Sequence, residues 1–317
     1  MNIVFFGSSR FAAPSLKALL TTQHNISCVV TQPDRQKGRG LHLQGTQIKV
    51  LAKESSLEVY QPQSINESQA SKFLKGLNPD LFIVISYGQV LSQEVLDIPR
   101  IFSINVHASL LPKYRGAAPI NWAIINRERN TGITVIKMTK KMDAGPIILQ
   151  KMTDIHDDDT SITLEDKLSH FAVQLLIDSL ESIESGNYKL LPQDEKQVSF
   201  APKLKKADGL IDWNKPAQDI YSLIRGCVSW PGAFTYYNGK ILKIYKAKVC
   251  LSVSPSVSQS IGQMIKVSPE GLIVVTGEGN LIIEELQIEG KRRMRIAEFI
   301  SGHKICTGEI LGKKIIA

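Results

Sequence analysis

The sequence predicts an α/β protein in two parts, a doubly wound and mostly parallel sheet followed by a smaller β domain. Short apolar stretches alternate with helical ones through the first 150 residues, which is the pattern of βαβ units. After residue 200, closely spaced strands and turns replace that alternation. A length of 317 residues also suits two domains of about 150 residues each. We therefore expect domains at 1–189 and 207–317, joined by a polar linker over 190–206.

The first domain is expected to be Rossmann-like. The run Leu81-Phe82-Ile83-Val84-Ile85 is continuously apolar, as in a strand that is covered on both faces of its sheet. Gly-x-Gly-x-x-Gly is absent after the first strand, so the dinucleotide-binding fingerprint fails. The predicted strands are 3–6, 27–31, 81–86, 102–106, 133–138 and 146–151. The predicted helices are 14–20, 48–54, 67–74 and 163–185.

The second domain has the pattern of a small antiparallel barrel. One helix is expected at 217–224, and turns rich in Gly and Asn separate the strands that follow it. Five short strands in about 100 residues fit an OB-like β-barrel. The predicted strands are 234–237, 240–249, 262–267, 272–276 and 281–288.

Positive charge is concentrated in the second part of the chain. Residues 1–190 hold 20 Lys/Arg and 18 Asp/Glu, a net of +2, whereas residues 191–317 hold 18 and 12, a net of +6. The two parts sum to the net charge of +8. Such a basic part favours an anionic partner, most simply nucleic acid. The alternative is that the charge only aids solubility.

Composition also limits the class of protein. No apolar run approaches the roughly 20 residues of a membrane helix, and the opening Met1–Gly7 lacks the charged n-region of a signal peptide. The four cysteines are far apart and form no Cys-x-x-Cys, so zinc and disulfides are not expected. We therefore expect a cytoplasmic protein without a membrane partner or a metal.

The most informative pattern is an Asn and a His at the end of the strand predicted at 102–106. Asn105 and His107 are two residues apart, so their side chains point the same way if the strand continues to His107. Ligands bind at the carboxyl ends of strands in α/β folds. An amide donor beside a titratable imidazole suits acyl transfer, in which a carbonyl oxygen gains negative charge.

Asp143 lies on a turn between two predicted strands. Considered alone, it is typical of a turn aspartate. A second interpretation is that it orients His107, because an imidazole that moves protons needs a carboxylate partner. Of the six histidines only His107 has such surroundings, and no His-Glu-x-x-His or comparable set of metal ligands occurs.

These residues carry a resemblance to a known family. The run Asn105–Ile120, with Met142–Ile147 downstream, resembles the folate-dependent formyltransferases. Its Asn-x-His-x-Ser-Leu-Leu-Pro motif and downstream Asp-x-Gly are specific to that superfamily. The resemblance covers nearly the whole chain and is strongest to bacterial members that act on methionyl initiator tRNA. Further matching segments are 3–7, 32–40, 87–88, 201–203 and 211–213.

The resemblance implies a reaction and a set of residues. The donor would be 10-formyltetrahydrofolate, and the acceptor would be the free amine of methionyl initiator tRNA, with no metal and no covalent enzyme intermediate. The catalytic trio would be Asn105, His107 and Asp143, and the state of His107, cationic or neutral, stays open. A monomer is expected. The residues expected to bind the folate are Ser109, Leu110, Leu111, Pro112, Tyr87 and Gly88.

The basic stretch 32–40 is either a solvated loop or an arm that grips phosphates. The resemblance implies the second, with the arm entering the tRNA acceptor end. Family members often carry a Lys and prolines after its Gly-Arg-Gly, whereas this chain has Leu41–Gln47, so grip is expected to rest more on Arg39 and Lys49. For the basic clusters of the second part of the chain, the alternative is that each is a solvated strand edge, since Lys also protects edges from pairing. The expected tRNA contacts are Arg35, Lys37, Arg39, Lys49, Lys203, Lys205, Lys206, Lys246, Lys248, Arg292 and Arg293.

Two other functions remain open at the level of sequence. A folate-dependent formyltransferase for an amino sugar or a small ribonucleotide would carry the same trio, but it would not need the basic second part. A non-enzymatic RNA-binding module built on an α/β scaffold would not need the trio. An assay of formyl transfer would separate the two enzymes from the RNA-binding module, and the acceptor that receives the formyl group would separate the two enzymes from each other.

Overall fold

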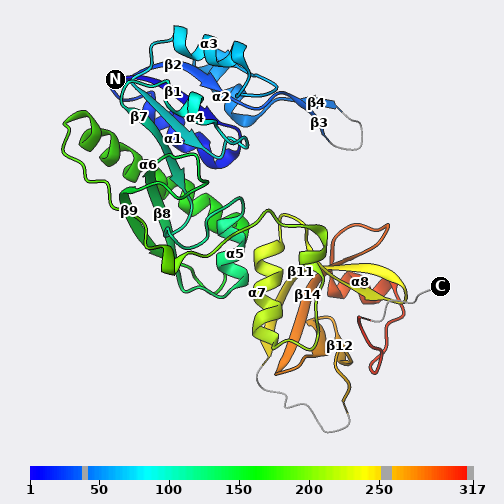
Figure 1. Cartoon of the computed structure of the whole chain (residues 1–317). Helices are drawn as coiled ribbons and strands as arrows, with labels where there is room; N and C mark the ends of the chain where they lie inside the picture. The colour runs from blue at the N-terminus through cyan, green and yellow to red at the C-terminus, as the bar shows by residue number, and fades with distance from the viewer. Residues whose placement is uncertain (38–41, 251–258, 313–317) are drawn as a thin grey trace. The chain divides into compact units, whose positions relative to one another are not determined.

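A computed structural model describes residues 1–37, 42–250 and 259–312 (Figure 1). The chain divides into two compact units. The first comprises Met1–Pro119, Asn130–Asp154 and Glu165–Pro202. The second comprises Ile120–Arg129, Ile155–Leu164 and the chain from Lys203 onward. The two short inserts of the second unit lie inside the range 1–189 that the sequence assigns to one domain.

The first unit is built on one seven-stranded sheet in the order β5-β2-β1-β6-β7-β8-β9. The first five strands pair in parallel, and β8 and β9 add antiparallel pairs at one edge. The prediction of a mostly parallel, Rossmann-like sheet is therefore confirmed. The strands are β1 (Asn2–Gly7), β2 (Asn25–Val30), β5 (Val59–Tyr60), β6 (Leu81–Ile85), β7 (Phe102–His107), β8 (Asn130–Lys137) and β9 (Ile147–Asp154).

Burial explains why β6 lies at the centre of this sheet. All five of its residues are buried, so both faces of the sheet are covered there. Aromatic residues close the core on one face, where Phe6 packs against Phe82 and Tyr87 at centroid distances of 4.9 and 5.4 Å. The helices of this part are η1 (Arg10–Ala12), α1 (Ala13–Leu19), α2 (Gln47–Glu54), α3 (Ser68–Gly76), α4 (Gln93–Leu96), η2 (Glu195–Gln197) and, from Glu165 onward, α6 (Ser161–Glu184).

Several short elements escaped the sequence analysis. The strand β5 has two residues and α4 has four, too few for a hydrophobic period to be visible. The basic stretch 32–40, predicted to be either a solvated loop or an arm that grips phosphates, contributes β3 (Arg35–Lys37), which pairs antiparallel with β4 (His42–Gln44) and projects from the sheet in Figure 1. Helix α6 was predicted at 163–185 and is found within two residues of both limits.

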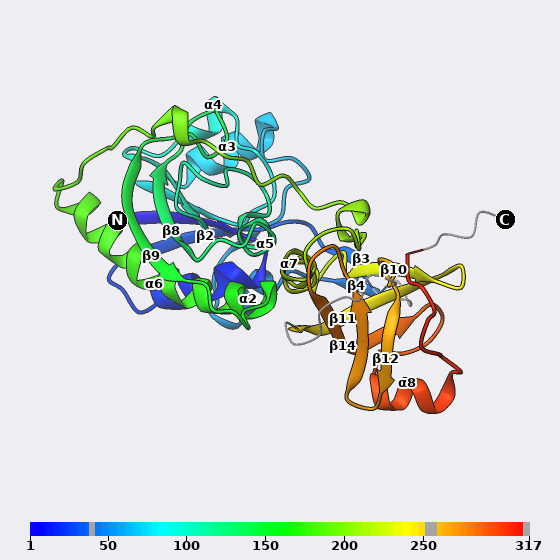
Figure 2. The ribbon, with the colours of Figure 1, turned by 90° about the horizontal axis from the view of Figure 1, so that it is seen from below.

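The second unit holds a six-stranded antiparallel sheet in the order β10-β11-β14-β13-β12, with β15 paired to β14. Among the described residues no pairing joins β10 to β12, so the OB-like barrel stays a prediction. Helix α8 packs beside β12, as Figure 2 also shows. The elements are α5 (Pro119–Ile125), η3 (Lys206–Gly209), α7 (Ala217–Cys227), β10 (Ala233–Tyr237), β11 (Lys240–Cys250), β12 (Met264–Ser268), β13 (Gly271–Val275), β14 (Asn280–Ile288), β15 (Met294–Arg295) and α8 (Ile296–Gly302).

Strand β14 is the centre of the second core, and it offers a matched pair of substitutions. Ile283 is fully buried, whereas its neighbour Ile282 points to the other face and is half-buried. Ile283→Ala should lower the free energy of unfolding by about 2–5 kcal/mol, because it leaves a cavity. Ile282→Ala should cost clearly less. Urea denaturation of the full chain measures both, and equal losses would contradict this account of the core.

Candidate functional site

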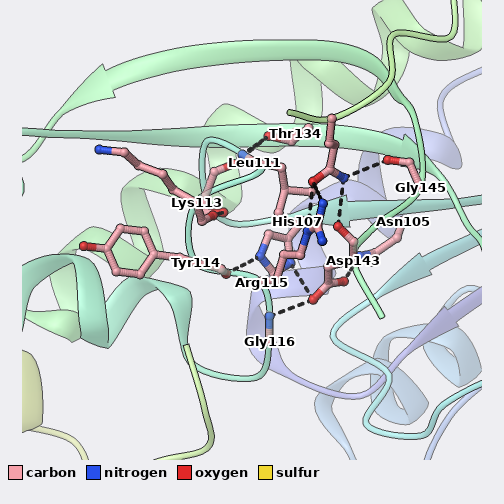
Figure 3. Close-up of polar contacts among 12 residues, drawn as sticks. Asn105, His107, Leu111, Lys113, Tyr114, Arg115, Gly116, Thr134, Asp143 and Gly145 are labelled. Atoms are coloured by element: carbon pink, nitrogen blue, oxygen red, sulfur yellow. Dashed lines mark hydrogen bonds and ion pairs between the residues drawn. The ribbon is translucent and has the colours of Figure 1, made fainter. Parts of the chain in front are cut away.

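The site begins where β7 ends. The strand continues to His107, as the sequence analysis required, so Asn105 and His107 project from the same face of the sheet. Asn105 is half-buried, and His107 is 6% exposed. Both side chains turn toward Asp143, which lies between β8 and β9 (Figure 3). The three residues singled out from the sequence therefore meet in space.

The carboxylate of Asp143 is the centre of this cluster. Asn105 Nδ2 donates to Asp143 Oδ1 at 3.2 Å, and the backbone N–H of Gly116 donates to Asp143 Oδ2 at 2.8 Å. His107 Nδ1 lies 3.7 Å from the same Oδ2. The Gly116 contact could not be predicted from residue spacing, because Gly116 lies in an irregular loop that only the fold brings to this turn.

The other nitrogen of His107 holds a proton whether the ring is neutral or cationic. Nε2 lies 2.9 Å from the carbonyl oxygen of Tyr114, in the loop that follows β7. A carbonyl oxygen can only accept, so Nε2 carries a proton and donates it. Nδ1, the nitrogen that faces Asp143, has no such contact with a carbonyl oxygen among the described residues and is the ring position that can accept a proton.

The turn that carries Asp143 is tightly constrained. Asp143 has φ +50°, in the left-handed region that residues with a Cβ rarely adopt. Gly145, two residues later, packs so closely that a Cβ there would lie 1.7 Å from the carbonyl oxygen of Lys137. No other residue fits at Gly145 without moving the turn.

The segment expected to bind the folate forms a braced loop after β7. Thr134 Oγ1 donates to the carbonyl of Ser109 at 2.6 Å and accepts from the N–H of Leu111 at 3.1 Å. The Ser109 hydroxyl donates to the carbonyl of Lys113 at 2.6 Å. Leu111 is buried, whereas Leu110 and Pro112 are half-buried. The loop thus has a fixed shape, and the side chains of Leu110 and Pro112 are partly accessible apolar groups on it.

Tyr87 and Gly88, also expected at the folate site, have different surroundings. The ring of Tyr87 belongs to the core and is 2% exposed, and burial raises the pKa of its hydroxyl well above the usual value. Gly88 is exposed and has φ +92°. Its backbone, and not the ring of Tyr87, is the part that a ligand can reach.

The hairpin expected to grip tRNA is braced at its base. Lys49 Nζ lies 2.5 Å from Asp34 Oδ2, and Gln61 donates to the other oxygen of that carboxylate at 2.8 Å. Hydrogen bonds from Gln61 and Lys49 hold the pKa of Asp34 below its usual value. Lys49 is therefore already paired with a carboxylate at the base of the hairpin. Arg35 is exposed on β3, Lys37 lies on the same strand, and Arg39 lies outside the described residues.

The seven residues of the second unit that were predicted to contact tRNA fall into two groups. Lys246 and Lys248 share the carboxylate of Glu284, at 3.2 and 2.5 Å. Arg292 lies 2.5 Å from Glu298, and Arg293 pairs with Glu285. By contrast, three lysines at the start of the unit are exposed and close together in sequence. They are Lys203, Lys205 and Lys206.

The described residues hold neither a metal-binding cluster nor a helix that could span a membrane. Within the ranges 1–37, 42–250 and 259–312, His, Cys, Asp and Glu side chains form no group of three that could hold a metal ion. In the same ranges, no helix combines the length and the apolar character needed to cross a membrane.

Known sequences and structures resemble this chain over nearly its whole length. The family "Formyl transferase" matches residues 1–180, and "Formyl transferase, C-terminal domain" matches residues 203–304. The methionyl-tRNA formyltransferase of Acetivibrio thermocellus is 42% identical over 313 residues, 99% of this chain and 100% of that protein. The enzyme of the same name from Caldanaerobacter subterraneus is 45% identical over 314 residues, 98% of this chain and 100% of that protein.

Solved structures with similar folds are more distant in sequence. An N-formyltransferase from Helicobacter canadensis, in complex with folinic acid and dTDP-3-aminofucose, gives a TM-score of 0.67 at 18% identity, covering 89% of this chain and 98% of that one. HypX from Aquifex aeolicus, in complex with tetrahydrofolic acid, gives a TM-score of 0.63 at 17% identity. The match covers 97% of this chain and 50% of the HypX chain. At these identities the similarity shows a shared fold.

The close packing at Gly145 predicts a large effect of a single methyl group. Gly145→Ala should lower the free energy of unfolding by about 3 kcal/mol or more, because the new Cβ would clash with the backbone of β8. Gly76→Ala is the control, since a Cβ at the end of α3 meets no atom within 4 Å. That variant should stay within about 1 kcal/mol of the wild type. Urea denaturation compares them, and a Gly145→Ala protein as stable as the control would refute the constraint.

Proposed function

This chain belongs to the methionyl-tRNA formyltransferase family, and on that basis we propose that Asn105, His107 and Asp143 carry out its reaction. The enzyme transfers a formyl group from 10-formyltetrahydrofolate to the amine of methionyl-tRNA. The observation that supports the assignment best is the meeting of an amide, an imidazole and a backbone N–H on the single carboxylate of Asp143.

The reaction needs stabilisation of a negative charge that develops on oxygen. The methionyl amine attacks the formyl carbon, a C–N bond forms, and the carbonyl oxygen becomes an oxyanion. Collapse of this intermediate breaks the bond to the folate nitrogen. Asn105 has two N–H groups on Nδ2, and Asp143 Oδ1 accepts from one of them. The second N–H is the donor that we assign to the oxyanion.

The methionyl amine must lose a proton, and we assign its removal to His107 with the help of Asp143. Nε2–H of His107 is held by the Tyr114 carbonyl, so Nδ1 is the nitrogen that accepts a proton. The 3.7 Å between Nδ1 and Asp143 Oδ2 is longer than a direct hydrogen bond, so Asp143 acts on the imidazolium through its charge. The departing folate nitrogen takes up a proton, which the same pair can return.

The acceptor is a polyanion, and we assign its binding to the basic second unit and to the β3–β4 hairpin. Exposed Lys203, Lys205 and Lys206 are better placed for phosphates than Lys246 and Lys248, which share Glu284. Selection of the initiator tRNA, an OB-like closure of the second sheet, a monomeric state and a cytoplasmic location belong to the same proposal.

If Asn105 and His107 are catalytic, their substitution should reduce turnover without weakening tRNA binding. Asn105→Ala should lower kcat by about 10²–10³-fold, since one oxyanion donor is removed. His107→Ala should lower it by about 10²–10⁴-fold, through loss of proton transfer. Transfer of radiolabelled formyl from 10-formyltetrahydrofolate to methionyl initiator tRNA measures both.

Binding of the same tRNA is the control for these two variants. Filter binding should give a Kd close to that of the wild type, because neither side chain belongs to the proposed phosphate contacts. Variants that lose tRNA affinity in step with activity would contradict the catalytic roles.

The two groups of basic residues predict different salt dependences. Lys205→Ala/Lys206→Ala should weaken tRNA binding and reduce the slope of log K against log salt by about 0.7–0.9 per lost phosphate contact. Lys246→Ala/Lys248→Ala removes the same charge but should change the slope less, because both lysines already pair with the Glu284 carboxylate. Titrations of each variant with tRNA at several salt concentrations measure the slopes. Equal changes in slope for the two double variants would refute the distinction between the two groups of lysines.

A further inference from the structure

A polar segment that was predicted to be part of a linker is hydrogen-bonded to both loops of the site. We name residues 191–201 the strap. At one end, Leu191 and Ile147 exchange two backbone hydrogen bonds of 2.8 and 2.9 Å, just beyond the turn of Asp143. Farther along, the N–H of Arg115 donates to the carbonyl of Ser199 at 2.9 Å, and the N–H of Ala201 donates to the carbonyl of Arg115 at 2.7 Å. The strap therefore joins the β8–β9 turn to the loop after β7.

Gln193 makes the contact closest to the reacting groups. Its Nε2 donates to the carbonyl oxygen of Asp143 at 2.8 Å and to that of Gly145 at 2.7 Å. Both N–H groups of one amide thus hold the turn from the side of the strap. Asp143 has a positive φ, a conformation that persists only where the surroundings impose it. Gln193 is part of those surroundings.

Arg115 fixes which way the Gln193 amide points. Its Nε and Nη2 donate to Gln193 Oε1 at 3.0 and 2.7 Å. Because a guanidinium can only donate, the oxygen of the amide must face Arg115 and the nitrogen must face the turn. Arg115 is 2% exposed, and Glu195 Oε1 lies 2.9 Å from its Nη2. Hydrogen bonds from Arg115 and Lys141 hold the pKa of Glu195 below its usual value, so the buried cation has an ionised partner.

We propose that Gln193 is a positioning residue for the formyl transfer, acting through Asp143 and oriented by Arg115. The inference rests on the proposed role of Asp143. Loss of the amide would free the turn, so that the Asp143 carboxylate no longer stays between Asn105, His107 and Gly116. Small displacements of reacting groups are costly, whereas substrate contacts made elsewhere would be unaffected. The effect should therefore fall on kcat and leave KM for both substrates near the wild-type value.

Three substitutions in the strap test this role. Gln193→Ala removes the amide, and Gln193→Glu keeps an oxygen for Arg115 but loses the two donors to the turn. Both should lower kcat by about 10²-fold. Gln197→Ala is the matched control, because Gln197 is an amide of the same strap that donates to the exposed Asp194. It should keep the wild-type kcat, and the melting temperatures of all three variants check that they fold.

A double-mutant cycle with Asp143→Ala shows whether Gln193 acts through that carboxylate. In the Asp143→Ala background, Gln193→Ala should cause no further loss in single-turnover formyl transfer, because the group it positions is gone. Additive losses, or a Gln193→Glu enzyme with the wild-type kcat, would overturn the proposal. Full activity of Asp143→Ala alone would instead overturn the proposed role of Asp143, so the two failures are distinguishable.

Discussion

The carboxylate of Asp143 is the interaction on which the rest of the site depends. Its side chain is only 12% exposed, and a buried carboxylate is stable only where donors satisfy it. Those donors come from β7 through Asn105 and from the loop after β7 through Gly116, and His107 faces the same group. Strand β8 pairs antiparallel with β7 and ends beside Ile104, near the start of β7. The turn that follows β8 folds back and brings Asp143 to Asn105 and His107 (Figure 3).

Backbone packing gives this arrangement its rigidity. A Cβ at Gly145 would lie 1.7 Å from the carbonyl oxygen of Lys137, and one at Gly116 would lie 2.6 Å from that of Ala201. The chain segments around the site are therefore in direct backbone contact on two sides. Such contact leaves the Asp143 turn little freedom, which suits a reaction whose rate depends on fixed donors and not on their rearrangement.

The sequence predicted those features that repeat with a period or stand at fixed spacing. The two-residue spacing of Asn105 and His107 placed both side chains on one face, and the apolar period of α6 located that helix. Tertiary pairings were out of reach. Gln193 lies in a polar, irregular segment, and its contacts depend on how the strap folds back. Likewise, the pairing of Lys248 with Glu284 depends on the register of β11 against β14.

The most direct test of the whole account is a comparison of acceptors under one formyl donor. With 10-formyltetrahydrofolate, the enzyme would be offered methionyl initiator tRNA, charged elongator tRNA and a nucleotide-linked amino sugar. The account predicts rapid transfer to the methionyl initiator tRNA, slower transfer to the elongator tRNA and none to the sugar. Transfer to the amino sugar alone would contradict it, because the basic second unit would then have no part in acceptor binding.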